Sequence, residues 1–158
     1  MHDVTARPNS MPWPPIIYLA AIAVSILLNV FYPLPWFRQP LSGFLFVLGW
    51  LLIAAFVALN ISAILAMRRA GTTVRPDRGT DHLVTDGPFS LTRNPLYLAG
   101  TMLVLGIGLV SGIVWFLLLA ILAAFTVQKL TIEREERHLQ ARFGETYLDY
   151  ARRVRRWI

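Results

Sequence analysis

The chain has 158 residues, of which 56% are hydrophobic, 15% are charged and none is cysteine. Soluble domains usually carry about 25% charged residues, so this composition favours a single domain whose surface lies largely in lipid. The lack of cysteine excludes disulfides, thiolate zinc sites and cysteine nucleophiles, while the formal net charge of +6 is compatible with nucleic acid or an anionic membrane surface.

Two long apolar runs follow a proline-containing segment at the N-terminus. We expect residues 1–14 to form a flexible tail and residues 15–158 to form a single membrane domain. The run at 15–32 is about long enough to cross a hydrocarbon core of roughly 30 Å, and no charge interrupts the run at 43–67. Because the prolines within 33–40 break a helix, these runs predict two separate spans.

A helical hairpin and an amphipathic helix complete the expected fold. Apolar runs at 95–110 and 113–130 predict two further spans, which turn at Ser111-Gly112. Residues 131–156 are charged but keep apolar side chains at helical spacing, so they predict an amphipathic helix that Gly144 caps or bends. The expected fold class is therefore all-α, a polytopic membrane protein with four transmembrane helices.

The basic residues are distributed very unevenly over the expected loops. Fourteen of the fifteen lie in the N-terminal tail, in the loop after the second span or after the fourth span, and Arg38 alone lies opposite. The positive-inside rule then places both termini in the cytoplasm of an integral membrane protein. A nucleic-acid partner is disfavoured, because no stacking aromatics interleave these arginines on a separate soluble domain.

One polar segment lies where the third span enters the membrane. Gly87-Pro88 predicts a turn, and Arg93-Asn94-Pro95 places a proline in the first turn of the helix. The free N–H groups of a helix start favour an anion. The other interpretation, which composition alone favours, is an arginine that snorkels to the interface beside an ordinary helix cap.

A second polar segment follows the fourth span directly. Glu133, Glu135 and Glu136 lie within one helical turn and repel one another unless cations relieve them. Arg134 and Arg137 offer such relief, so one interpretation is a solvated helix with ion pairs. The other is a carboxylate that faces a cationic ligand at the interface. No zinc spacing, nucleophile elbow or phosphate loop is present, so we expect no metal.

Together these two segments resemble the paired blocks of the isoprenylcysteine carboxyl methyltransferase family, which includes the phospholipid N-methyltransferases. The first block matches 83–89 (Leu-Val-Thr-Asp-Gly-Pro-Phe) and 93–100 (Arg-Asn-Pro-Leu-Tyr-Leu-Ala-Gly). The second matches 135–139 (Glu-Glu-Arg-His-Leu) and 143–150 (Phe-Gly-Glu-Thr-Tyr-Leu-Asp-Tyr). The similarity covers about 67–157, and two ordered blocks that flank a membrane hairpin form a specific signal.

The resemblance implies an S-adenosylmethionine-dependent methyltransferase, with a cytoplasmic cofactor pocket between the loop after the second span and the C-terminal helix. It implies catalytic roles for Arg93 and Glu135. The implied cofactor contacts are His82, Leu83, Val84, Phe89, Asn94, Pro95, Leu96, Tyr97, Glu135 and Glu136. A glutamate suits the cofactor's ammonium, and an arginine or a helix start suits its carboxylate.

The expected acceptor is amphiphilic or lipid-like and enters from the bilayer, with oxygen, nitrogen or sulfur as the methylated atom. Thr131 stands where the prenylcysteine enzymes place an arginine for the substrate carboxylate, and whether Arg134 replaces it is open. The oligomeric state is open as well.

Two alternatives belong to other functional classes. A sterol-reductase-like membrane enzyme would bind NADPH, for which Arg75 and Arg78 supply a basic cluster. A non-catalytic membrane scaffold would bind no small molecule. The glutamate-rich second block suits a cationic cofactor better than an anionic one.

Overall fold

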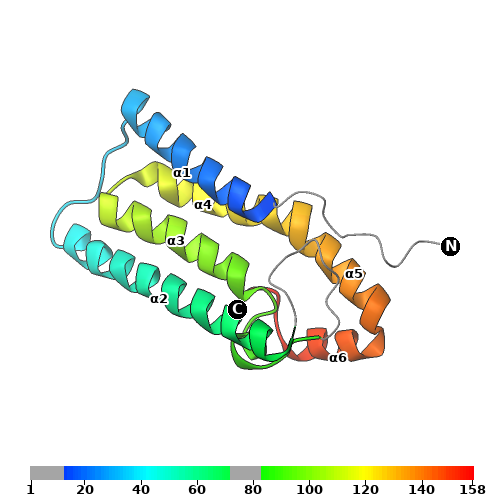
Figure 1. Ribbon diagram of the computed structural model, residues 1–158. Helices are drawn as coiled ribbons and strands as arrows, with labels where there is room; N and C mark the ends of the chain where they lie inside the picture. The colour runs from blue at the N-terminus through cyan, green and yellow to red at the C-terminus, as the bar shows by residue number, and fades with distance from the viewer. Residues whose placement is uncertain (1–12, 72–82) are drawn as a thin grey trace.

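The computed structural model describes residues 13–71 and 83–158, and in these ranges every regular element is helical (Figure 1). The elements are α1 (Trp13–Phe31), α2 (Leu41–Arg69), the 3₁₀ turn η1 (Gly87–Ser90), α3 (Pro95–Ser111), α4 (Val114–Val127), the π-helical turn η2 (Gln128–Ile132), α5 (Glu133–Phe143) and α6 (Glu145–Arg153). The all-α fold class expected from the sequence is confirmed.

Three helices of the described chain are long and apolar enough to cross a membrane. These are α1, α2 and the continuous helix Val114–Phe143 that α4, η2 and α5 build. α3 is apolar but has only 17 residues, or about 25 Å at 1.5 Å per residue. The protein is thus an integral membrane protein with three candidate spans, and a fourth span through α3 stays a prediction.

The helix ends follow the prolines and the turn residues of the sequence. α1 ends at Phe31 and α2 begins after Pro40, as the prolines between them predict. Trp115 in α4 donates a 2.7 Å hydrogen bond to the Tyr32 carbonyl, so the α3–α4 turn lies at the same end of the bundle as the α1–α2 connection (Figure 1). α3 therefore runs along the bundle from the opposite end to the end that holds the α1–α2 connection.

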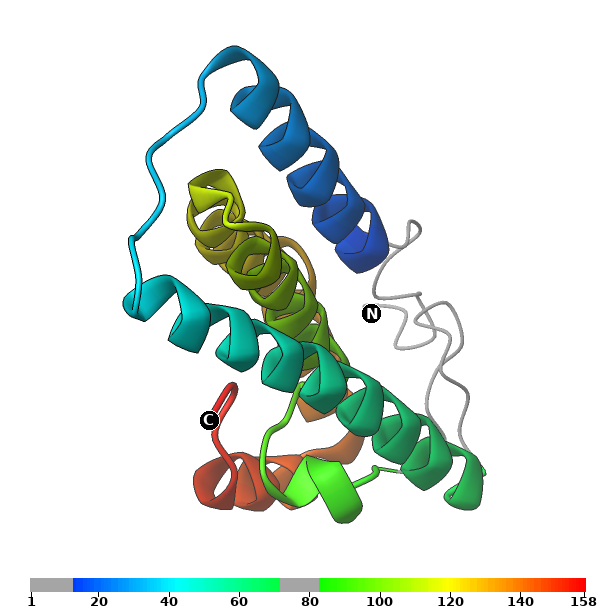
Figure 2. The ribbon, with the colours of Figure 1, turned by 90° about the vertical axis from the view of Figure 1, so that its left-hand side faces the viewer.

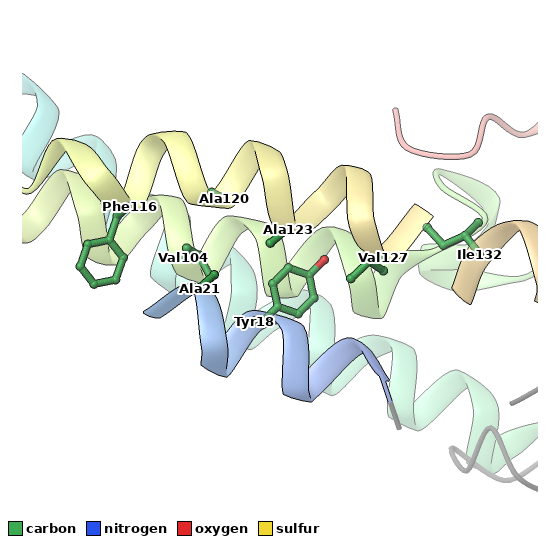
Figure 3. Close-up of a cluster of buried hydrophobic side chains, with 8 residues drawn as sticks. All are labelled: Tyr18, Ala21, Val104, Phe116, Ala120, Ala123, Val127 and Ile132. Carbon is green, nitrogen blue, oxygen red and sulfur yellow. The ribbon is translucent and has the colours of Figure 1, made fainter. Parts of the chain in front are cut away.

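The core lies where α1, α3 and α4 meet, with α3 packed between α2 and α4 (Figure 2). Small residues on α4 let the helices approach closely, and larger side chains fill the remaining space. Figure 3 shows the cluster: Tyr18, Ala21, Val104, Phe116, Ala120, Ala123, Val127 and Ile132. Its last two members connect the apolar core to the polar end of the bundle.

The single amphipathic helix expected over 131–156 is wrong. η2 and α5 continue α4 without a break as far as Phe143, and the chain then turns into α6 (Figure 1). Gly144 causes the turn, since its φ of 53° and ψ of −128° suit a residue without a Cβ. α6 ends at Arg153, and Val154 is extended. The bend that the sequence predicted at Gly144 is confirmed, but residues 154–158 do not continue the helix.

Candidate functional site

Three segments of the chain meet at the polar end of the bundle. They are the turn before α3 (91–94), the first turns of α5, and residues 154–158, which we call the strap. The strap leads from α6 back towards the start of α3 (Figure 1). Both polar segments singled out in the sequence therefore contribute to one site.

Glu135 on α5 carries a carboxylate that pairs with no cation of the described chain. The Tyr97 hydroxyl, from the first turns of α3, donates a 2.8 Å hydrogen bond to its Oε1. Within 13–71 and 83–158 no arginine, lysine or histidine pairs with it. Glu133 differs, because Lys129 binds it at 2.7 Å on the exposed side of the helix. Glu135 is thus the carboxylate placed to receive a cation.

Glu136 lies between two arginines. Arg93 Nη1 is 3.1 Å from its Oε1, while Arg156 binds both of its oxygens, Nε to Oε1 at 3.0 Å and Nη2 to Oε2 at 2.6 Å. The exposed fractions of the side chains are 16% for Arg93, 15% for Glu136 and 32% for Arg156. The hydrogen bonds to Glu136 raise the pKa of Arg156 above its ordinary value. The two arginines leave this triad with one positive charge in excess.

Arg93 has donor capacity left over. Its Nη1 also lies 3.2 Å from the Tyr147 hydroxyl, but its Nε is buried and has no partner in the described chain. A buried N–H without an acceptor is costly, and such groups are rare in folded proteins. Among the described residues, the site therefore contains a donor without a partner on the Arg93 cation and, on Glu135, a carboxylate without a cation. This pair is complementary to a zwitterion such as an α-amino acid.

The strap binds the turn before α3 through its backbone. The Arg93 N–H donates to the Arg155 carbonyl at 2.9 Å, and Thr92 Oγ1 and Asn94 Nδ2 donate to the Arg156 carbonyl at 3.1 and 2.9 Å. Trp157 Nε1 donates to Gln128 Oε1 at 2.8 Å. Asn94, expected as a cofactor contact, thus uses its amide to hold the strap.

Sequence reasoning missed the strap. Arg156 lies in a run of four arginines within 152–156, where nothing in the pattern distinguishes it from its exposed neighbours Arg152 and Arg153. The tryptophan at 157 was the one available signal, because an aromatic residue after a basic run indicates a segment that packs against something.

The loop before α3 is held by the aromatic face of α6. Tyr150 donates a 2.6 Å hydrogen bond to the Phe89 carbonyl, and burial raises the pKa of Tyr150 to about 12, so its hydroxyl stays protonated. Burial also raises the pKa of Tyr147. Through Tyr147 and Tyr150, the second sequence block (135–150) thus positions the first (83–100).

Leu83 and Val84 line a separate cavity of about 490 Å³ between the loop and the end of α2. The other lining residues are Ser62, Leu65, Ala66, Arg69, Ala70, Asp86, Gly87 and Pro88. Neither Phe89 nor any of 94–97 nor Glu135 lines it, so of the expected cofactor residues within the described ranges this cavity contains only Leu83 and Val84. His82 lies outside the described residues. Pro95 is buried and Leu96 half-buried in the first turn of α3.

Comparison with known proteins identifies relatives in two ways. The family model for phospholipid methyltransferases matches residues 44–146, more than half of the chain. The nickel-cobalt-cadmium resistance protein NccN of Alcaligenes xylosoxydans xylosoxydans is 39% identical over 78 residues, which are 49% of this chain and 36% of that protein. The cobalt-zinc-cadmium resistance protein CzcN of Cupriavidus metallidurans is 36% identical over 77 residues, 49% of this chain and 35% of that protein.

The chain therefore spans about a third of the length of these curated relatives. No solved structure matches it. Although both relatives are named for metal resistance, the part of the chain that the structure describes holds no group of three histidine, aspartate or glutamate side chains that could bind a metal ion.

Proposed function

The chain belongs to the phospholipid methyltransferase family, and we propose that it is an integral membrane methyltransferase that uses S-adenosylmethionine to methylate an amphiphilic or lipid-like acceptor. The observation that carries this proposal is that the Glu135 carboxylate pairs with no cation of the described chain, while Arg93, which binds the neighbouring Glu136, has an Nε without a partner there. We assign to the pair the amino-acid end of the cofactor. Glu135 would pair with its ammonium and Arg93 with its carboxylate.

These residue types fit the cofactor. Because two arginines already neutralise Glu136, we assign the ammonium to Glu135 alone. The cavity lined by Leu83 and Val84 is largely apolar and supports a role in holding the adenine. When bound, S-adenosylmethionine supplies a methyl group on a positively charged sulfur.

In methyl transfer the protein has to position the two reactants, and it forms no covalent bond to either of them. The acceptor atom must be aligned with the methyl group, so residues that hold the cofactor and the acceptor in place accelerate the reaction. The methyl donor loses its positive charge as the bond forms, and apolar surroundings that exclude water therefore favour the reaction. We infer that the acceptor enters from the bilayer, since α2 exposes apolar side chains such as Leu65 up to the polar end of the bundle.

We place the site at the cytoplasmic face, with both termini on that side. The positive-inside rule supports this orientation, because the basic loop and the basic C-terminal segment bracket the site.

Calorimetric titration of the detergent-purified protein tests the proposal. S-adenosylhomocysteine should bind with a 1:1 stoichiometry, and NADPH, titrated in parallel, should not. Binding of NADPH alone would replace the proposal with a reductase, and binding of neither would favour a scaffold. In liposomes, transfer of labelled methyl to lipid should require the protein and S-adenosylmethionine.

A further inference from the structure

Glu136 is shared unequally between its two arginines. Arg156 holds both carboxylate oxygens, in a fork with distances of 3.0 and 2.6 Å, whereas Arg93 makes one longer contact of 3.1 Å. Planar forks of this kind are the strongest pairs that arginine forms with a carboxylate. Arg156 therefore neutralises Glu136 whether or not Arg93 takes part.

This sharing decides what Arg93 is free to do. Glu136 is only 15% exposed, and a carboxylate at such a place is costly when its last cation leaves. If Arg93 were its only partner, binding a second anion through Arg93 would weaken the first pair. Because Arg156 is present, Arg93 can turn towards another carboxylate without leaving Glu136 unpaired.

We propose that Arg156 is a positioning residue, which holds Glu136 so that Arg93 is available to the carboxylate of the bound cofactor. The inference rests on the proposed function. Arg156 itself contacts no cofactor in this scheme. It acts on the cofactor through Glu136 and Arg93.

The strap places Arg156 for this role. Its backbone carbonyls bind Thr92, Arg93 and Asn94, and the indole N–H of Trp157 binds Gln128. Trp157 also packs against the apolar core cluster. These contacts fix the backbone on both sides of the Arg156 side chain, so its fork does not depend on the ion pair alone.

The decisive experiment compares two ligands in one variant. Arg156→Ala should weaken S-adenosylhomocysteine, which carries the amino-acid carboxylate, by about tenfold. It should leave 5′-methylthioadenosine, which lacks that moiety, within about twofold. Arg156→Lys should recover part of the loss, since lysine restores the charge but not the fork. Arg152→Ala is the matched control, because it removes an equal charge from an exposed pair with Asp149.

Each other result overturns the proposal. Equal weakening of both ligands would make Arg156 a purely structural residue, and no weakening of either would remove it from the site. If Arg156→Ala does not fold, Arg156→Gln serves in the same comparison, because it removes the charge and keeps a hydrogen-bonding side chain.

A measurement without ligand separates this inference from the proposed function. Arg93→Ala and Arg156→Ala should each lower the apparent unfolding temperature modestly, because one arginine remains on Glu136. The double variant should lose more than the sum, because Glu136 is then unpaired. If the losses of the two single variants simply add in the double variant, Arg93 and Arg156 do not share Glu136, and the proposal is overturned. A synergistic loss in a protein that does not bind S-adenosylhomocysteine would instead refute the proposed function and leave the sharing of Glu136 intact.

Discussion

Tyr97 and Glu135 are joined by a hydrogen bond of 2.8 Å, although 38 residues separate them in the sequence. Tyr97 lies in the first turns of α3 and Glu135 in the first turn of α5, so this contact links the two polar motifs directly. A hydroxyl that donates to a carboxylate fixes the orientation of that carboxylate. The orientation of Oε2, the other oxygen of Glu135, is then also fixed, although no cation of the described chain pairs with the carboxylate.

Tyr97→Phe should lower the stability of the protein by about 1.5–3 kcal/mol, the usual contribution of a hydrogen bond to a charged group. The apparent unfolding temperature in one detergent measures the loss. In a Glu135→Gln background the same substitution should cost less, because the bond is then neutral. Tyr32→Phe is the control, since Tyr32 lies exposed at the end of α1. An equal loss of stability from Tyr97→Phe in both backgrounds would show that the Tyr97 hydroxyl does not stabilise the protein through the Glu135 carboxylate.

Glu135→Gln should weaken S-adenosylhomocysteine about ten- to a hundredfold, because a charge-assisted contact to the ligand's ammonium is lost. Glu133→Gln is its matched control, since Glu133 faces outward and pairs with Lys129. Calorimetry on both variants measures the difference. A loss of affinity in Glu133→Gln with none in Glu135→Gln would show that the carboxylates have been assigned wrongly.

The sequence predicted the apolar helices well because hydrophobic run length and proline position determine them locally. The two motifs were also enough to bring Tyr97 and Glu135 to one end of the bundle. What the sequence did not predict depends on tertiary contact. The partner of Glu136 is Arg156, which is one arginine among several and is selected only by the path of the strap after α6. Likewise, nothing in the sequence indicated that the Asn94 amide donates to the Arg156 carbonyl.

Gly100→Ala should destabilise the protein by about 1–3 kcal/mol, the usual cost of overpacking a core. A Cβ at position 100 would lie 2.5 Å from Cε2 of Tyr18, whose hydroxyl is already fixed by the Tyr97 carbonyl at 2.8 Å. Thermal unfolding measures the cost. In a Tyr18→Ala background the extra cost of Gly100→Ala should disappear. Gly43→Ala should have little effect, because its Cβ would meet only the side chain of Gln39. A persistent cost without the Tyr18 ring would contradict this account.

The membrane topology is tested by reporter fusions at three positions. A reporter after Ile158 should lie in the cytoplasm, and reporters near Arg38 and at Gly112 should lie on the opposite side. The distribution of basic residues supports the first two positions. The third follows from the hydrogen bond between Trp115 and Tyr32, which brings the α3–α4 turn to the α1–α2 end. A cytoplasmic reporter at Gly112 would show that α3 does not cross.

The last prediction concerns the acceptor, which should lack a carboxylate as its main handle. The position at which the prenylcysteine enzymes place an arginine is Thr131, which is fully buried in η2 with no hydrogen-bond partner for its hydroxyl within the described ranges. A threonine hydroxyl offers no charged fork. Arg134 is exposed on α5 and three residues further along the helix, so we expect that it does not take over that position inside the bundle.

A competition assay in bilayers tests this expectation. An amino-headgroup phospholipid, a hydrophobic thiol and a prenylcysteine acid would be offered together, and transfer of labelled methyl to each would be followed. We expect transfer to the phospholipid or the thiol, unchanged in Arg134→Ala. Fast methylation of the prenylcysteine acid alone, abolished by Arg134→Ala, would refute the prediction. In that case the substrate arginine has moved along the helix, and Arg134 must reach the site from a conformation in which α5 has rotated.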